Sequence, residues 1–163
     1  MKKLHPNALA LFYLTGVIVW LFILAIFVGP LLVVLTVEGT ISAGILFIIF
    51  FFGLAIILLL PLPFSYWSYQ NYKYELQADR ISIEKGVIWK KYVSIPYERV
   101  QNVDIIRGPL ARMLGLSDLQ IQTAGASTNL MIEGRIPGIT FEEANKLKDE
   151  ILSKVSKKKN QGL

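Results

Sequence analysis

One apolar stretch, from Ala8 to Leu62, constrains the fold more than any other part of this 163-residue chain. It holds 55 residues and a single formal charge, that of Glu38. A bilayer core about 30 Å thick is crossed by about 20 apolar residues in helical form. The stretch is therefore long enough to cross a membrane twice, with a break between the two crossings at residues 38–40.

We expect a transmembrane helical hairpin over residues 1–63, with spans at about 8–35 and 41–62. The chain begins Met-Lys-Lys, as a signal peptide does, but the apolar run that follows is too long for one. The sequence therefore predicts an uncleaved anchor.

Prolines mark the ends of these spans. Because Pro30 has no N–H to donate, the first helix ends or kinks there. We favour a kinked continuation, and the alternative lays residues 31–37 along the outer interface. Pro61 and Pro63 are expected to close the second span.

Basic residues predict the orientation of the hairpin. The connection around Glu38 has no Lys or Arg, whereas Lys2 and Lys3 precede the spans and Lys73 and Arg80 follow them. The positive-inside rule then puts both termini and the rest of the chain in the cytoplasm of a multi-pass cell-membrane protein. Residues 64–71 are rich in aromatic side chains and are predicted to be an interfacial linker, with Trp67 at the headgroup level.

Beyond the linker, apolar and polar residues alternate with the period of β-strands. We expect strands at about 72–77, 80–84, 87–95, 102–105, 119–123 and 130–136, and Tyr72 in the soluble core. Short strands with turns at this spacing predict an antiparallel sandwich or barrel. Residues 109–114 are predicted to form one helical turn, which Gly115 stops.

The last predicted element is a helix. Thr140 and Glu143 have the spacing of a capping box. Apolar residues recur behind them at helical spacing, namely Phe141, Ala144, Leu147, Ile151, Leu152 and Val155. Such a stripe is expected to pack on the sheet, and a helix lying on the membrane is the alternative. The domain is therefore predicted over residues 72–156, followed by a basic disordered tail over 157–163.

The stretch from Ile95 to Gly125 reads IPYERVQNVDIIRGPLARMLGLSDLQIQTAG. It resembles the bacterial PH-domain membrane protein family, the YdbS-like group, as does the preceding YELQADRISIEKGVIWKKYVS. The resemblance implies a membrane-anchored α+β chain, with two N-terminal transmembrane helices and a PH-like antiparallel β-sandwich or barrel capped by a C-terminal α-helix. Most members of that family are domains of unassigned role, so it implies a binding or scaffolding module rather than an enzyme.

Nothing in the sequence indicates chemistry. The chain has no cysteine and one histidine, His5, so Cys–His and Ser–His–Asp sites are excluded. It has no phosphate-binding glycine motif, and we expect no catalysis, cofactor or metal. The part after Leu62 carries a formal charge of +4. That modest excess suits a face near anionic lipid better than nucleic-acid binding, which we do not expect.

Two groups of residues are candidate binding sites. Arg99, Gln101, Arg107 and Arg112 are predicted to bind a membrane-protein partner or a second copy, because guanidinium forks recognise carboxylates and backbone oxygens. The alternative is internal, with Arg112 holding the helical turn to the sheet by bonding to Asp104 or to backbone carbonyls. The second group, Trp67, Lys85, Lys90 and Lys91, is predicted to contact membrane lipid.

Specific phosphoinositide binding is not expected. The family resemblance would place several basic residues between the first two strands, and here that loop, residues 77–80, is short and contains an acid. The leading hypothesis is a non-enzymatic, membrane-tethered cytoplasmic module that associates with itself or with another membrane protein. The alternative is a sensor of anionic lipid surfaces that acts through the basic hairpin and tail.

Overall fold

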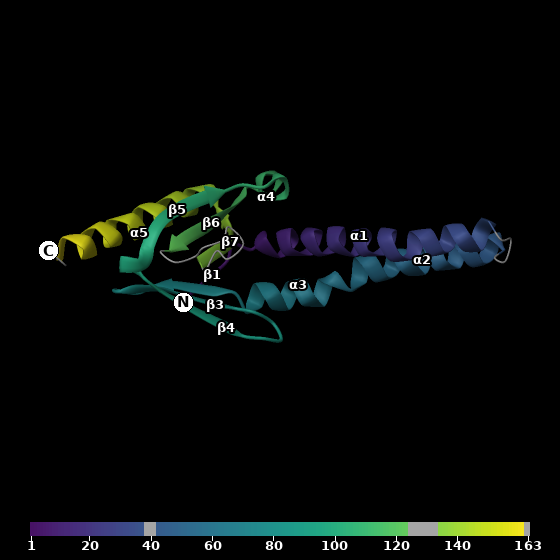
Figure 1. Cartoon of the computed structure of the whole chain (residues 1–163), viewed down its shortest axis with the longest axis horizontal. Coiled ribbons are helices and arrows are strands. Elements are labelled where there is room, and N and C mark those ends of the chain that lie inside the picture. The colour runs from purple at the N-terminus through teal and green to yellow at the C-terminus, as the bar shows by residue number, and fades with distance from the viewer. Residues whose placement is uncertain (38–41, 124–133, 162–163) are drawn as a thin grey trace. The chain divides into compact units, whose positions relative to one another are not determined.

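The computed structural model describes residues 1–37, 42–123 and 134–161 (Figure 1). The chain forms two compact units. One, which we call the domain, combines Met1–Leu11 with Trp67–Leu163, and the other, the helical hairpin, is Phe12–Tyr66. The sequence predicted that residues 1–63 all belong to the helical hairpin. In the structure the first eleven residues belong to the domain instead.

The helical hairpin consists of α1 (Ala8–Val37), α2 (Ala43–Leu59) and the start of α3 (Pro61–Gln70). As favoured above, α1 continues through Pro30. Pro61 was expected to close the second span, and this was wrong: it begins α3, since proline is tolerated in the first turn of a helix. Most of the predicted linker is therefore helical.

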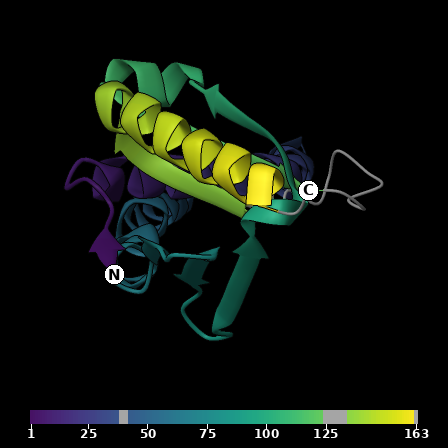
Figure 2. The same ribbon diagram turned by 90° about the vertical axis from the view of Figure 1, so that its left-hand side faces the viewer.

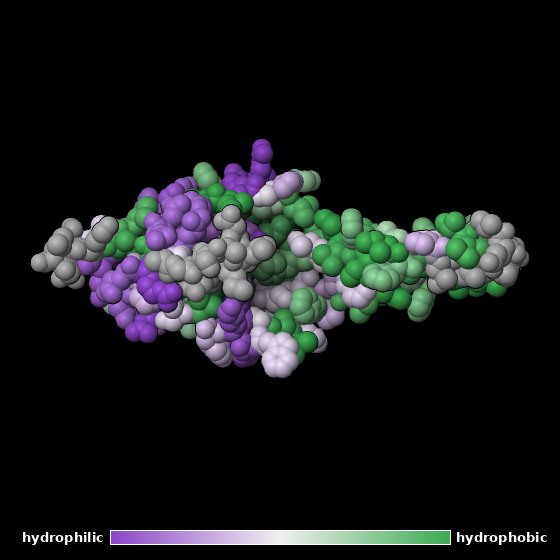
Figure 3. Space-filling view, viewed as in Figure 1, coloured by the Kyte–Doolittle hydropathy of each residue, from purple (hydrophilic) through white to green (hydrophobic). Residues whose placement is uncertain are grey.

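Two stretches are long and apolar enough to cross a membrane, Ala8–Val34 and Phe47–Gln70. Their large apolar side chains are mostly exposed, and Figure 3 shows them covering α1 and α2. Exposed apolar side chains over two whole helices are stable only in a surrounding as apolar as lipid.

The domain contains two antiparallel sheets. The first has the order β1 (Lys2–Lys3), β2 (Lys73–Leu76), β3 (Arg80–Lys85), β4 (Lys91–Pro96). The short helix η1 (Tyr97–Arg99) leads to the second, with the order β5 (Val100–Ile106), β6 (Leu116–Thr123), β7 (Gly134–Thr140). The predicted turn of helix is α4 (Pro109–Met113), between β5 and β6.

The helix α5 (Phe141–Gln161) covers the second sheet (Figure 2). Its predicted apolar stripe is buried at Ala144, Leu147 and Ile151. The Thr140 hydroxyl accepts the Glu143 N–H at 3.2 Å, as predicted. The reciprocal half of the capping box is replaced, because the Glu143 carboxylate accepts the Tyr74 hydroxyl at 2.8 Å. The predicted disordered tail is helical as far as Gln161.

The beginning of the chain is built into the domain. Lys2 and Lys3 pair with Tyr74 and Lys73 of β2, and Leu4 is buried behind them. The His5 N–H donates to the Gly138 carbonyl of β7 at 3.2 Å. The chain therefore leaves the domain at α1 and returns to it at α3.

Strand directions define two ends of this domain. We call the near end the one where α1 begins and α3 ends, and the far end the opposite one. Lys73 pairs with Glu84, so the β3–β4 turn lies at the near end. Leu11 of α1 clusters with Ala111 and Leu116, which places α4 there too.

The far end is fixed by two contacts between segments that are distant in sequence. The Tyr97 N–H of η1 donates to the Asp79 carbonyl of the β2–β3 turn at 3.2 Å. Lys158 in the last turns of α5 lies 3.7 Å from Glu98. The β2–β3 turn, η1 and the end of α5 therefore share the far end.

Candidate functional site

The predicted arginine surface is divided between the two ends of the domain. Arg99 in η1 and Gln101 at the start of β5 are exposed at the far end. Arg107 and Arg112 follow the other end of β5, which is 7 residues long. A strand of that length spans about 20 Å at about 3.3 Å per residue. The four side chains therefore do not form one contact surface.

Arg107 has internal partners. Its Nε donates to the Leu116 carbonyl at 3.3 Å, and its guanidinium lies 5.0 Å from the centre of the Phe141 ring. A cation over an aromatic face is attracted by the ring's quadrupole. Arg107 thus joins the segment before α4 to the first residue of α5, and its role is structural.

Arg112 is exposed on α4. The expected internal partner, Asp104, is engaged elsewhere: it accepts hydrogen bonds from Asn102 at 3.0 Å and from Gln122 at 2.8 Å. Asp104 is therefore held by neighbouring side-chain amides, and it was only one of the two internal partners expected for Arg112.

Charged side chains at the far end bond to one another. Asp79 and Arg80 form an ion pair of 2.7 Å, and the Arg80 hydrogen bond lowers the pKa of the Asp79 carboxyl. Lys154 of α5 donates to the Gln77 carbonyl at 3.2 Å and lies 5.5 Å from the centre of the Tyr97 ring. These contacts tie α5 and η1 to the β2–β3 turn.

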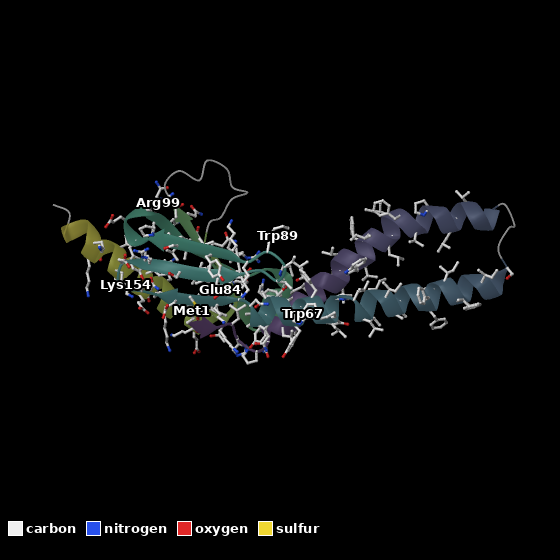
Figure 4. The ribbon with its side chains drawn as sticks, turned by 90° about the horizontal axis from the view of Figure 1, so that it is seen from below. Met1, Trp67, Glu84, Trp89, Arg99 and Lys154 are labelled. Atoms are coloured by element: carbon white, nitrogen blue, oxygen red, sulfur yellow. The ribbon has the colours of Figure 1, made fainter. Side chains whose placement is uncertain are left out.

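The four predicted lipid-contact residues do come together, all at the near end. Trp67 lies in the last turn of α3 with 54% of its surface exposed. Lys85 and Lys91 are directly opposite each other on β3 and β4, and Lys90 lies 3.9 Å from Glu84. Figure 4 shows Trp67 and Trp89 at one end of the domain, and Arg99 and Lys154 toward the other.

Sequence reasoning missed the most exposed residues of this group. Ile88 and Trp89 were assigned to a strand over 87–95, but β4 begins only at Lys91, and the two side chains are 82% and 87% exposed at the hairpin tip. Gly86, which follows Lys85 and precedes a short apolar run over residues 87–89, is the turn signal in the sequence. The basic tail that was grouped with this hairpin lies at the far end, with Lys158 beside Glu98.

The buried polar groups of the domain serve its structure. Burial raises the pKa values of Tyr72 and Tyr74 above their usual range, so both stay protonated and donate, Tyr72 to the Arg135 carbonyl and Tyr74 to Glu143. Asp118 forms an ion pair with Arg135 and accepts the Gly138 N–H at 3.2 Å. Across residues 1–37, 42–123 and 134–161, no three acidic or histidine side chains gather as a metal site would require.

Comparison with known proteins gives the same fold class as the geometry. A family described as "Bacterial PH domain" matches residues 8–155. The UPF0699 transmembrane protein YdbS of Bacillus subtilis (strain 168) is 34% identical over 80 residues, which are 49% of this chain and 46% of that protein. The UPF0699 transmembrane protein YdbT of the same organism is 29% identical over 98 residues, 59% of this chain and 19% of that protein.

The chain thus spans less than half the length of these relatives, and no solved structure matches it. The family match covers both apolar helices and the two-sheet domain with its closing helix, the layout expected from the sequence. The chain is therefore a membrane protein of the bacterial PH-domain family.

Proposed function

We propose that the protein is a non-enzymatic, membrane-tethered binding module that associates with another membrane protein or with a second copy of itself. The observation that carries the proposal is that residues 1–11 are part of the domain. Both helices of the tether therefore leave from one folded unit.

Such an anchor favours association with other membrane proteins. Confinement to a membrane raises the effective concentration of two partners without adding any contact between them. The distribution of Lys and Arg around the spans supports a cytoplasmic position for the domain.

The far end supplies the contact surface in this proposal. Arg99 and Gln101 are exposed there, and a guanidinium can recognise a carboxylate or a carbonyl of a partner with two parallel hydrogen bonds. Arg107 is left out of the surface because it already bonds to Leu116 and covers Phe141. Arg112 is left out because β5 separates it from Arg99.

Co-purification from mild detergent tests this function. We expect Arg99→Ala with Gln101→Ala to reduce recovery of a co-purifying membrane protein, or cross-linking to a differently tagged second copy, by at least tenfold. Arg112→Ala is the matched control, since it removes an exposed arginine from the near end. Retention of every partner by the folded double variant would contradict the proposal, and circular dichroism establishes that it is folded.

A further inference from the structure

The β3–β4 hairpin has an exposed apolar tip on a defined turn. Ile88 and Trp89 are 82% and 87% exposed, far more than large apolar side chains in a domain core. Gly86 has φ +111°, and a Cβ there would lie 2.0 Å from the Trp89 carbonyl oxygen. The turn therefore holds these two side chains outward in a set conformation that only glycine at position 86 permits.

The register of the strands shows where this tip points. Lys73 is opposite Glu84, so residues 86–90 extend past the beginning of β2, on the side from which α3 arrives. The second apolar stretch ends in this part of the domain, at Gln70, and the first begins at Ala8. Headgroups lie where apolar spans meet polar chain, and indole rings are favoured at that depth.

The charges beneath the tip point to an anionic contact. Lys85 and Lys91 are directly opposite each other, and like charges in that arrangement repel. Burial, and then the nearby Lys91 and Arg135, lower the pKa of Lys85. Among the residues that the structure describes, Lys85 and Lys91 form no ion pair, whereas Lys90 has Glu84 within 3.9 Å.

We propose that the β3–β4 hairpin is a second membrane contact, in which Ile88 and Trp89 enter the headgroup layer of the bilayer that holds the spans and Lys85 and Lys91 bind phosphates of its anionic lipids. An anionic phosphate between the two ammonium groups replaces their repulsion with two attractions. The apolar tip supplies the hydrophobic part of the contact, and the combination of both forces is typical of interfacial anchors. This contact is separate from the far-end association proposed above.

Quenching of Trp89 fluorescence in the full chain tests the apolar part. Trp20→Phe with Trp67→Phe leaves Trp89 as the single tryptophan, and the protein is placed in nanodiscs whose lipids carry bromine near the headgroup end of the acyl chain. We expect at least a twofold loss of emission relative to unbrominated nanodiscs. A tryptophan at far-end position 98, introduced as Glu98→Trp with Trp89→Phe in the same background, should keep its emission. Unquenched Trp89 emission in every lipid would overturn the proposal and would leave a protein partner as the occupant of the tip.

Lipid charge tests the lysines. With Trp89 as the single tryptophan, quenching should increase as phosphatidylglycerol replaces phosphatidylcholine, and Lys85→Gln with Lys91→Gln should remove that increase. Lys146→Gln with Lys157→Gln removes the same charge from exposed positions of α5 and should leave it unchanged. If the extent of quenching changes neither with lipid charge nor with the lysine substitutions, the lysines do not bind lipid phosphates and this part of the proposal is refuted.

A second probe keeps the test valid if the tryptophan substitutions disturb folding. The chain has no cysteine, so Ile88→Cys accepts a polarity-sensitive dye at one position only. Its emission should shift to the blue in anionic nanodiscs, and a dye at Glu98→Cys should not shift. Equal emission at both positions would overturn the proposal. Neither measurement depends on a protein partner, so its failure is distinct from failure of the co-purification experiment.

Discussion

The two ends of the PH-like domain both carry basic side chains, but these side chains have different bonding partners at each end. At the far end, Arg80 pairs with Asp79, and Lys154 reaches the Gln77 carbonyl. At the near end, Lys85 and Lys91 face each other below an exposed tryptophan. The difference shows that charge composition alone does not locate a membrane contact. Basic groups that the fold brings together without an acid between them are more informative than basic groups as such.

The largest expected effect is in the labelling of single cysteines from outside intact cells, because a cysteine on the inner side of the membrane is not labelled at all. Lys2→Cys and Glu98→Cys lie in one domain, at β1 and at the far end, and both should be protected from an impermeant thiol reagent in intact cells. Thr40→Cys, between the two apolar stretches, should be labelled from outside. Labelling of Lys2→Cys and Glu98→Cys from opposite sides would break the claim that the domain includes the start of the chain.

Gly138→Ala should destabilise the near end most. Gly138 has φ +64°, and an added Cβ would lie 2.4 Å from the Ala8 Cβ where α1 leaves the domain. An alanine at this position would be strained by the left-handed backbone and would be packed too closely against Ala8. Together these two effects predict a loss of about 3 kcal/mol in the free energy of unfolding. Thermal unfolding followed by circular dichroism measures it. The matched far-end change Arg80→Ala should leave the melting temperature unchanged. If Arg80→Ala and Gly138→Ala lowered the melting temperature equally, the two ends would not differ in this respect.

Two lysines should respond to substitution with opposite signs. Lys154→Gln removes a hydrogen bond and a cation–π contact at the far end and should cost about 1 kcal/mol. Lys85→Gln removes a half-buried charge that repels Lys91, so the melting temperature should rise slightly. Destabilisation by Lys85→Gln would mean that Lys85 has an internal role.

The pH dependence of Lys85 has a definite sign. Its pKa is lower in the folded domain than in the unfolded chain, so its charge destabilises the fold at a pH below the folded value. That cost is relieved as the pH rises through the folded value toward the ordinary lysine value. The stability difference between Lys85→Gln and the unchanged protein should therefore narrow in alkaline buffer, and a difference that widens would contradict this account.

The smallest effect should come from Asp79. Arg80 holds the pKa of the Asp79 carboxyl below its usual value, so this ion pair contributes at a pH above the ordinary carboxyl pKa and is lost as the pH falls through the lowered value. Because the pair is exposed, Asp79→Asn should change the melting temperature barely measurably at neutral pH, and not at all in 1 M salt. A large shift would show that the far end is less solvated than described.

Much of the fold could be predicted because it rests on local patterns. Alternation marks β2, β3, β5 and β6, the spacing of Ala144, Leu147 and Ile151 marks the buried face of α5, and Thr140 marks its start. The last strand was predicted over 130–136, whereas β7 is Gly134–Thr140, and residues 130–133 lie outside the described part of the chain. Proline was misleading at position 61, since its effect depends on whether a helix begins or continues there. The strand β1 had no signal, because two lysines next to a membrane span have no strand pattern.

The candidate sites were harder to predict, because they depend on where the strands end. Arg99 and Arg107 are near in sequence, but an extended strand carries them to opposite ends of the domain. Asp104 was one expected partner of Arg112, but it accepts a hydrogen bond from Gln122, which the register places opposite Asn102, two residues away. The residues predicted to contact lipid lie near one another because Lys85, Lys90 and Lys91 flank one turn, and turns keep sequence neighbours together; their contact with lipid stays a prediction.

The pairing of Lys2 with Tyr74 also has a consequence for synthesis. The ribosome makes β1 before its partner β2, which emerges only after both apolar helices have been translated. The first sheet can therefore be completed only after the hairpin has had time to enter the bilayer, and only if both of its ends remain on one side.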